Sequence, residues 1–361
     1  MPYIPYTLEN TTIVITGGAG FIGSNLAMYF QKHHPKARVI VLDKFRDPSL
    51  SSLGHFKNLI GFEGQIITAD IIQDLSVLEE INFNYLFHLA AISNTTCLNQ
   101  ELVMQTNHQA FLKLLKIAQN KGARVIYASS AAVYGNTDAP NQVGLNEVPE
   151  NVYGFSKLCM DRSTLELIRV YENEPIGLPH YNNSRRSKRS PYRYSVSVAG
   201  FVPVAGYIDT PIIGLRYFNV YGPGEFYKGK TASMILQLGL QALQNKEVKL
   251  FEFGEQQRDF VYIEDVIQAS VKAMVAIDQV GVYNVGYGKS HSYNTIIEIL
   301  QQELGDFKTT YIKNPYAFFQ NHTCADIQST HKDLDYTPNY DLVSGIKAYL
   351  PTIKKLAKAN V

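Results

Sequence analysis

Tryptophan is absent from this chain of 361 residues, and cysteine is rare, with three copies. Cys97, Cys159 and Cys324 form no closely spaced pair, and their number is odd. They therefore provide neither the ligand spacing of a metal site nor a framework of disulfides. We expect reduced thiols, a cytoplasmic location and no bound metal.

A surplus of charge of either sign is also missing, because 33 lysine and arginine residues are balanced by 32 acidic residues. This balance gives no reason to expect a nucleic acid or a membrane as a partner. The first residues show no signal-peptide pattern, and no apolar run approaches the roughly 18 residues of a membrane span. With 45% apolar residues, the chain can form a sizeable core in one large domain or two integrated ones.

The first informative pattern is a short β-branched strand, residues 12–16, that runs into a glycine-rich stretch at 17–23. A helical pattern follows directly. Glycines at this spacing permit a tight turn, close approach of a pyrophosphate and close packing of helix on strand. The candidate dinucleotide contacts are Gly17, Gly20 and Gly23.

The next predicted strand, residues 38–42, ends in Asp43. An acidic residue about 20 positions after the glycine turn often binds an adenosine ribose. Asp43 could also be a loop residue that caps the next element. Lys44, Arg46 and Lys57 lie nearby and could instead accommodate a 2′-phosphate.

Strands and helices continue to alternate, with predicted strands at 64–68, 85–88 and 124–128 and a helix from about 99 to 120. This alternation predicts an α/β fold with a doubly wound parallel sheet, which binds ligands at the carboxyl ends of its strands. The polar or small residues beyond these strands are therefore candidate ligand contacts. They are Asp70 and Ile71, Leu89, Ala90, Ala91 and Ser93, Asn107 on the helix, and Ser129 and Ser130.

Tyr153 and Lys157 lie four residues apart at the start of a further predicted helix. This spacing places both side chains on one helix face. A neighbouring cation lowers the pKa of a tyrosine, so Tyr153 could act as a general acid or base. The same spacing is also common on solvated helix faces, where it has no catalytic meaning.

Four segments together resemble the extended short-chain dehydrogenases/reductases, the superfamily of nucleotide-sugar epimerases and dehydratases. The segments are GGAGFIG (17–23), SSAAVYG (129–135), YGFSK (153–157) and RDFVYIEDV (258–266). The resemblance implies a Rossmann-type domain and a smaller C-terminal α/β lobe that binds substrate. It also implies a catalytic group in which Ser130 binds the reacting oxygen, Tyr153 exchanges a proton, and Lys157 tunes Tyr153 and holds the nicotinamide ribose.

Later segments are similar to the ADP-glyceromanno-heptose 6-epimerases in particular, above all RYFNVYGP at 216–223. This likeness implies an isomerase that interconverts ADP-D-glycero- and ADP-L-glycero-β-D-manno-heptose by transient oxidation at C6″, for lipopolysaccharide heptose supply. It implies a homo-oligomer with NADP, although Asp43 itself would suit NAD. Lys228 would face the sugar opposite Tyr153, unless it is a flexible loop lysine.

The likeness also implies further contacts with the two ligands. Cofactor contacts are expected from Phe21, Ile22, Val220 and Lys228, and substrate contacts from Ser130, Asn219, Lys230, Gln237, Phe251, Glu252, Phe253, Gly254, Arg258 and Tyr316. Arg258 suits a diphosphate, or could instead form an ion pair with Asp259. Gly224, Lys230 and Gln237 depart from the residues usual in such relatives, which affects substrate contacts rather than the chemistry.

We expect a nucleotide-binding domain over 1–178, a basic insertion over 179–210, and a mainly substrate-binding lobe over 211–361 with some segments returning to the first domain. The insertion is flanked by a near repeat of Pro-Ile-Gly-Leu and could contact an anion or a partner, or simply be solvated. Two other functions remain open, a UDP-sugar 4-epimerase and a non-catalytic nucleotide-binding scaffold.

Overall fold

The computed structural model describes residues 2–46, 54–73, 75–173, 211–313 and 320–359. Its centre is a seven-stranded sheet with the strand order β10-β6-β5-β4-β1-β2-β3. All of its strand pairs are parallel, which confirms the predicted doubly wound α/β fold. The strands are β1 (Thr12–Thr16), β2 (Arg38–Asp43), β3 (Gln65–Thr68), β4 (Tyr85–His88), β5 (Arg124–Ser130), β6 (Ile212–Tyr217) and β10 (Gly281–Val285).

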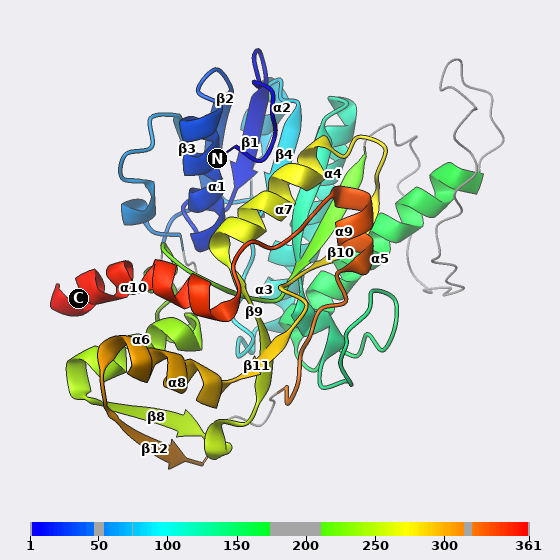
Figure 1. The fold of residues 1–361 in the computed structure, drawn as a ribbon. Coiled ribbons are helices and arrows are strands. Elements are labelled where there is room, and N and C mark those ends of the chain that lie inside the picture. The colour runs from blue at the N-terminus through cyan, green and yellow to red at the C-terminus, as the bar shows by residue number, and fades with distance from the viewer. Residues whose placement is uncertain (1, 47–53, 74, 174–210, 314–319, 360–361) are drawn as a thin grey trace.

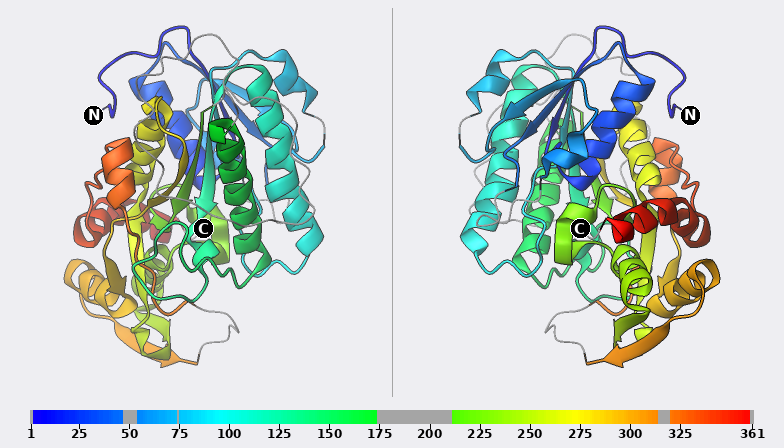
Figure 2. Two further views of the ribbon diagram at one scale, coloured as in Figure 1. Left: turned by 90° about the vertical axis from the view of Figure 1, so that its right-hand side faces the viewer. Right: turned by 90° about the vertical axis from the view of Figure 1, so that its left-hand side faces the viewer.

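Helices cover both faces of this sheet, as Figure 2 shows with the sheet seen between its two helical layers. Alternate residues of β1 divide between the layers: Ile13 and Ile15 belong to one hydrophobic cluster and Val14 to the other. This division follows from the period of two along a strand. One layer contains α1 (Phe21–His33) and α7 (Ile263–Val275); the other contains α2 (Ser76–Glu80), α3 (Gln100–Met104), η2 (Gln105–Gln109), α4 (Ala110–Asn120) and α5 (Val152–Asn173).

The order of the strands reverses at β1, because the chain first adds β2 and β3 on one side and then β4 on the other. Such a switch point opens a crevice at the carboxyl ends of the strands, where ligands bind in open α/β sheets. The glycine turn after β1 and the loop after β4 both lie at this crevice. Short 3-10 helices η1 (Phe56–Leu59) and η3 (Ala131–Tyr134) follow β2 and β5.

The second part of the structure lies beneath the large sheet in the view of Figure 1. Two small sheets form it, one of order β11-β9-β7 and one that pairs β12 with β8. Helices α6, α8 and α10 pack together beside them. The elements are β7 (Asn219–Tyr221), η5 (Phe226–Thr231), α6 (Met234–Asn245), β8 (Glu247–Phe251), η6 (Glu252–Gly254), β9 (Gln257–Tyr262), β11 (Ser290–Ser292), α8 (Tyr293–Leu304), β12 (Lys308–Ile312), α9 (Gln328–Leu334) and α10 (Leu342–Lys358).

Two strands from the second half of the chain, β6 and β10, complete the large sheet. The domain limits expected at 178 and 211 stay predictions, and the insertion expected over 179–210 lies outside the described residues. Within the ranges described, no helix combines the length and apolar character needed to cross a membrane. The same ranges contain no cluster of three or more His, Cys, Asp or Glu side chains that could hold a metal ion.

Candidate active site

The glycine-rich turn between β1 and α1 is built so closely that side chains are excluded. Gly17 has a φ of 72°, and a Cβ there would lie 2.5 Å from the Ala90 nitrogen. A Cβ on Gly23 would lie 2.3 Å from the Gly17 oxygen. Gly20 is the N-cap of α1 and offers no side-chain cap. The first amides of α1 are therefore available to an anionic ligand such as a pyrophosphate.

Asp43 lies at the end of β2 and is almost fully buried, with 7% exposure. Its carboxylate accepts hydrogen bonds from the Ala19 nitrogen at 2.9 Å and the Phe45 nitrogen at 2.7 Å. Burial raises the pKa of Asp43, and these backbone hydrogen bonds oppose the rise. Asp43 thus braces the glycine turn and the following loop, which is the capping role that the sequence left open. Its contact with a ribose stays a prediction.

Basic side chains gather just beyond Asp43. Lys44 pairs with Asp70, with 3.2 Å between Nζ and Oδ2. Arg46 and Lys57 lie near enough to His55 to lower its pKa, after the larger effect of burial. Arg46, His55 and Lys57 therefore form a basic cluster in the segment that follows β2.

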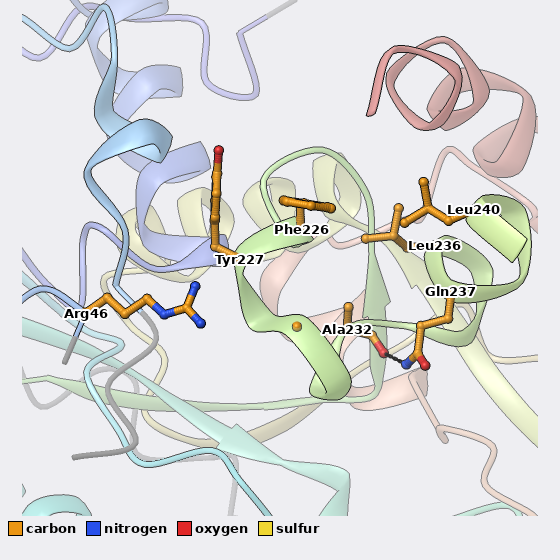
Figure 3. Close-up of a pocket in the computed structure, with 8 residues that line it drawn as sticks. Arg46, Phe226, Tyr227, Ala232, Leu236, Gln237 and Leu240 are labelled. Atoms are coloured by element: carbon orange, nitrogen blue, oxygen red, sulfur yellow. Dashed lines mark hydrogen bonds between the residues drawn. The ribbon is translucent and has the colours of Figure 1, made fainter. Parts of the chain in front are cut away.

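The basic cluster contacts the loop that carries Lys228. The ring of His55 stacks on that of Tyr227, with 3.7 Å between centroids and 8° between planes. Figure 3 shows the Arg46 guanidinium beside Tyr227, next to a cavity of about 270 Å³ that Phe226, Leu236 and Gln237 also line. The two halves of the chain thus meet at this point through an aromatic contact.

The loop after β4 is held in place by Asn107, which is fully buried in the π-helical turn η2. Its Oδ1 accepts from the Ile92 nitrogen at 2.8 Å, and its Nδ2 donates to the Ile92 oxygen at 3.0 Å and to Ser156 Oγ at 2.9 Å. Any effect of Asn107 on a cofactor would therefore pass through the loop that contains Leu89, Ala90, Ala91 and Ser93.

Ile71, another predicted ligand contact, has a buried side chain. Its side chain is 4% exposed and packs in the hydrophobic cluster below the sheet with Leu75 and Leu86. The expected cofactor contact could come only from its backbone. Asp70 lies beside it, and Asp70 Oδ1 accepts from the Ile72 nitrogen at 3.2 Å.

Ser130, Tyr153 and Lys157 lie together at the ends of β5 and α5. Ser130 lies close enough to Tyr153 to act on its pKa. Lys157 is 1% exposed, and its Nζ donates to the Ala128 oxygen at 2.8 Å and lies 6.0 Å from the centroid of the Tyr153 ring. Tyr153 and Lys157 therefore lie on one face of α5, as their spacing predicted.

The predicted direction of the Tyr153 pKa is wrong. A lowered pKa was expected for Tyr153, but burial raises it, and Ser130 opposes the rise. Desolvation of the phenolate is thus the largest effect. Burial also lowers the pKa of Lys157 to about 8, against the opposing charge of Asp161.

Asp161, one turn beyond Lys157 on α5, was missed in the sequence. It is fully buried and accepts hydrogen bonds from Tyr127 Oη at 2.9 Å, Ser129 Oγ at 2.8 Å and Arg216 Nε at 2.7 Å. The Ser129 side chain is therefore engaged inside the protein, whereas Ser130 meets Tyr153. The spacing of four residues from Lys157 was the one signal that could have indicated Asp161.

Lys228, in η5, lies beside the glycine turn. Its Nζ is 5.6 Å from the centroid of the Phe21 ring, and Phe21 is the first residue of α1. Lys228 is half-buried; burial lowers its pKa and the nearby Glu225 opposes this effect. This placement differs from that of a solvated loop lysine.

The remaining candidates come from the second part of the structure. Phe253 in η6 has a left-handed backbone with a φ of 56°, and its ring is 68% exposed. Gln237 Nε2 donates to the Ala232 oxygen at 2.7 Å, so it secures the end of the Lys228 loop (Figure 3).

The other predicted contacts in this part differ in their exposure and position. Val220 is partly buried and Lys230 is exposed. Phe251 belongs to β8, Glu252 and Gly254 belong to η6, and Tyr316 lies outside the described residues.

Arg258 and Asp259 are neighbours on β9, but the Asp259 carboxylate binds backbone instead of the guanidinium. It accepts from the nitrogens of Tyr287 at 2.7 Å, Gly288 at 2.9 Å and Ala325 at 3.0 Å. The Arg258 guanidinium lies 5.8 Å from the Tyr293 ring. Asn219 joins this region, since its Nδ2 donates to the Asp259 oxygen at 3.3 Å.

Comparison with known proteins finds similar sequences and structures. The model of a family described as "NAD dependent epimerase/dehydratase family" matches residues 13–189 and 187–286. An ADP-L-glycero-D-manno-heptose-6-epimerase from Brachyspira hyodysenteriae is 30% identical over 352 residues, which cover 95% of this chain and 98% of that protein.

Solved structures of similar proteins cover nearly the whole chain. The crystal structure of Helicobacter pylori ADP-L-glycero-D-manno-heptose-6-epimerase is 60% identical, with a TM-score of 0.83, and covers 98% of this chain and 99% of that one. UDP-glucuronic acid 4-epimerase from Bacillus cereus, solved with UDP-glucuronic acid and NAD, is 26% identical with a TM-score of 0.74 over 96% and 100% of the two chains.

Proposed function

The chain belongs to the NAD dependent epimerase/dehydratase family, and on that premise we propose that it is an ADP-glyceromanno-heptose 6-epimerase. The observation that carries the proposal is the 60% identity, over almost the full length, to a heptose 6-epimerase of known structure. The placement of Lys228 at the start of α1 supports it. The substrate is then the ADP-linked heptose, and the changed centre is C6″.

A nicotinamide dinucleotide fits the crevice, because the contacts of Gly17 and Gly23 leave no room for a Cβ and α1 has no side-chain cap. We assign NADP rather than NAD, since Arg46, His55 and Lys57 form a basic cluster suited to a 2′-phosphate. Denaturing the purified protein and identifying the released nucleotide tests this assignment; release of NAD would contradict it.

A nicotinamide held in this crevice would supply reversible hydride transfer at C6″. The protein must therefore exchange the hydroxyl proton on either side of that carbon. Tyr153, beside Ser130, serves one side, and Lys228 serves the other. Burial lowers the pKa of Lys228, which favours the neutral amine that a base requires. Lys157 keeps its ammonium beside Tyr153.

The test is to incubate the protein with ADP-D-glycero-D-manno-heptose and follow the C6″ configuration by NMR. We expect interconversion by the wild type and a loss of about 10²–10⁴-fold in Tyr153→Phe and in Lys228→Met, the usual range for a lost acid or base. Failure of the wild type to interconvert the two heptoses, or full activity in both variants, would contradict the proposal. UDP-glucose supplied in parallel distinguishes a UDP-sugar 4-epimerase.

The assembly and the location of the protein are part of the same proposal. The resemblance to the heptose epimerases implies a homo-oligomer in the cytoplasm. Light scattering of the purified protein measures the assembly, and a monomeric mass at micromolar concentration would contradict this part while leaving the proposed reaction intact.

A further inference from the structure

Glu225 has no part in the chemistry proposed above, yet it is a fully buried acidic side chain directly before the loop that carries Lys228. Burying a carboxylate is unfavourable unless it is hydrogen-bonded and paired with opposite charge. Its 0% exposure also excludes direct contact with a substrate in this conformation. The contacts of Glu225 therefore need an explanation within the fold.

The carboxylate of Glu225 connects the two ends of the Lys228 loop. Its Oε1 accepts from the Gly222 nitrogen at 3.2 Å and from Ser233 Oγ at 2.7 Å, and its Oε2 accepts from the Ser233 nitrogen at 2.6 Å. Gly222 precedes the loop, and Ser233 is the N-cap of α6 that follows it. One side chain thus closes the segment 222–233.

Inside this closed segment, Lys228 is fixed at its backbone. The Lys228 nitrogen donates to the Glu225 oxygen at 2.9 Å, and Thr231 Oγ1 donates to the Lys228 oxygen at 3.0 Å. The segment is also attached to α1, because Asn25 Nδ2 donates to the Pro223 oxygen at 2.9 Å and to the Phe21 oxygen at 2.8 Å. Asn25 therefore holds both the Lys228 loop and Phe21, whose ring lies near the Lys228 ammonium.

The charges of Glu225 and Lys228 also act on each other. Burial raises the pKa of Glu225, and the charge of Lys228 opposes this rise. Burial lowers the pKa of Lys228, and the charge of Glu225 opposes this fall. The phenols of Tyr221 on β7 and Tyr349 on α10 also interact with Glu225. Burial raises the pKa of both phenols, so they stay protonated and uncharged. Lys228 is the cation that interacts with Glu225.

We propose that Glu225 is a positioning residue for Lys228, closing the loop from Gly222 to Ser233 so that the ammonium stays over Phe21. The inference rests on the proposed role of Lys228 as the second acid or base. Glu225 itself touches neither substrate nor cofactor. It sets where Lys228 stands and how readily Lys228 releases its proton.

The experiment compares Glu225→Gln, which keeps the shape and removes the charge, with Ser233→Ala. The second variant keeps the charge but removes the hydrogen bond to Glu225 and the N-cap hydrogen bond from the Leu236 nitrogen. Lysine side chains carrying isotope-labelled methyl groups are titrated by NMR, and the Lys228 signal is identified by its loss in Lys228→Met. Without the carboxylate, the Lys228 pKa should fall further in Glu225→Gln, because Glu225 opposes the lowering caused by burial. In Ser233→Ala it should stay near the wild-type value.

Epimerase kinetics complete the test. We expect Glu225→Ala to lose about 100-fold in kcat through misplacement of Lys228, with part of this loss restored in Glu225→Gln. An unchanged Lys228 pKa in Glu225→Gln, or an equal shift in Ser233→Ala, would overturn the inference. So would wild-type kcat in Glu225→Ala while Lys228→Met is inactive. Full turnover in Lys228→Met would instead refute the proposed role of Lys228 as acid or base, and the Lys228 titration would still report on the contact with Glu225.

Discussion

Replacing Lys157 by methionine should stabilise the fold while removing the activity. Lys157 is 1% exposed, and its hydrogen bond to the Ala128 oxygen is 2.8 Å long. Burial lowers its pKa from the ordinary 10.5 to about 8. A charged Lys157 is therefore unfavourable for folding at neutral pH, although the proposed chemistry needs its charge beside Tyr153.

The size of the effect follows from the two pKa values. Lowering the pKa from 10.5 to about 8 corresponds to about 3 kcal/mol at pH 7. The variant loses the hydrogen bond to the Ala128 oxygen, which costs about 1 kcal/mol. Methionine is an unbranched side chain of similar length that adapts to irregular core space. We expect a net gain of about 1–2 kcal/mol in the free energy of unfolding.

The pH dependence gives the sharper test. Below pH 8 the native protein must carry the unfavourable charge, so the destabilisation is fully present. Between pH 8 and 10.5 the native state releases the proton and the unfolded state keeps it, so the stability of the wild type rises with pH. The advantage of Lys157→Met should therefore shrink across this range.

Urea unfolding of both proteins at pH 7 and at pH 9.5, followed by circular dichroism, measures this difference. Other groups that titrate at pH 9.5 affect both proteins and cancel in the comparison. Lys308→Met is the control, because its side chain is 73% exposed and its effect should stay within about 0.5 kcal/mol. The reasoning is refuted if Lys157→Met is less stable than the wild type at pH 7, or if the difference is the same at both pH values.

Two further predictions concern other charged groups. Arg216→Met should lower the free energy of unfolding by about 3–5 kcal/mol in urea, because it leaves the buried Asp161 carboxylate without its cation; a loss below 1 kcal/mol would contradict this. Replacing Arg46 and Lys57 together by alanine should weaken NADP binding at least about tenfold and leave NAD binding nearly unchanged, as calorimetry can measure. Equal weakening for both nucleotides would show that the basic cluster does not bind the 2′-phosphate.

The sequence was sufficient for features that depend on neighbours along the chain. The alternation of strands and helices predicted the parallel sheet, and the predicted strand at 85–88 coincides with β4. Periodicity and turn chemistry are local, so they can be recognised before the fold is known. The proximity of Tyr153 and Lys157 could also be predicted, because it follows from their spacing along one helix.

Features that depend on burial and on distant partners could not be predicted. The direction of the Tyr153 pKa depends on desolvation, which spacing does not indicate. Ile71 follows a strand like its neighbour Asp70, yet its side chain packs in the core. Asp161 has its cation on β6, beyond a long stretch of chain, and no motif connects the two residues.

These distant partners connect stability to catalysis along α5. Arg216 opposes the rise in the Asp161 pKa that burial causes, and so favours the carboxylate. Asp161 in turn opposes the fall in the Lys157 pKa, and so favours the ammonium beside Tyr153. The charge of Lys157 therefore depends on a residue that never touches it. Glu225 and Lys228 are related in the same way in the other half of the chain. In both halves a buried carboxylate, held by hydrogen bonds of the fold, favours the protonated form of a lysine. For Lys228 this opposes the neutral amine that a base requires, so Glu225 serves the reaction through the position of Lys228.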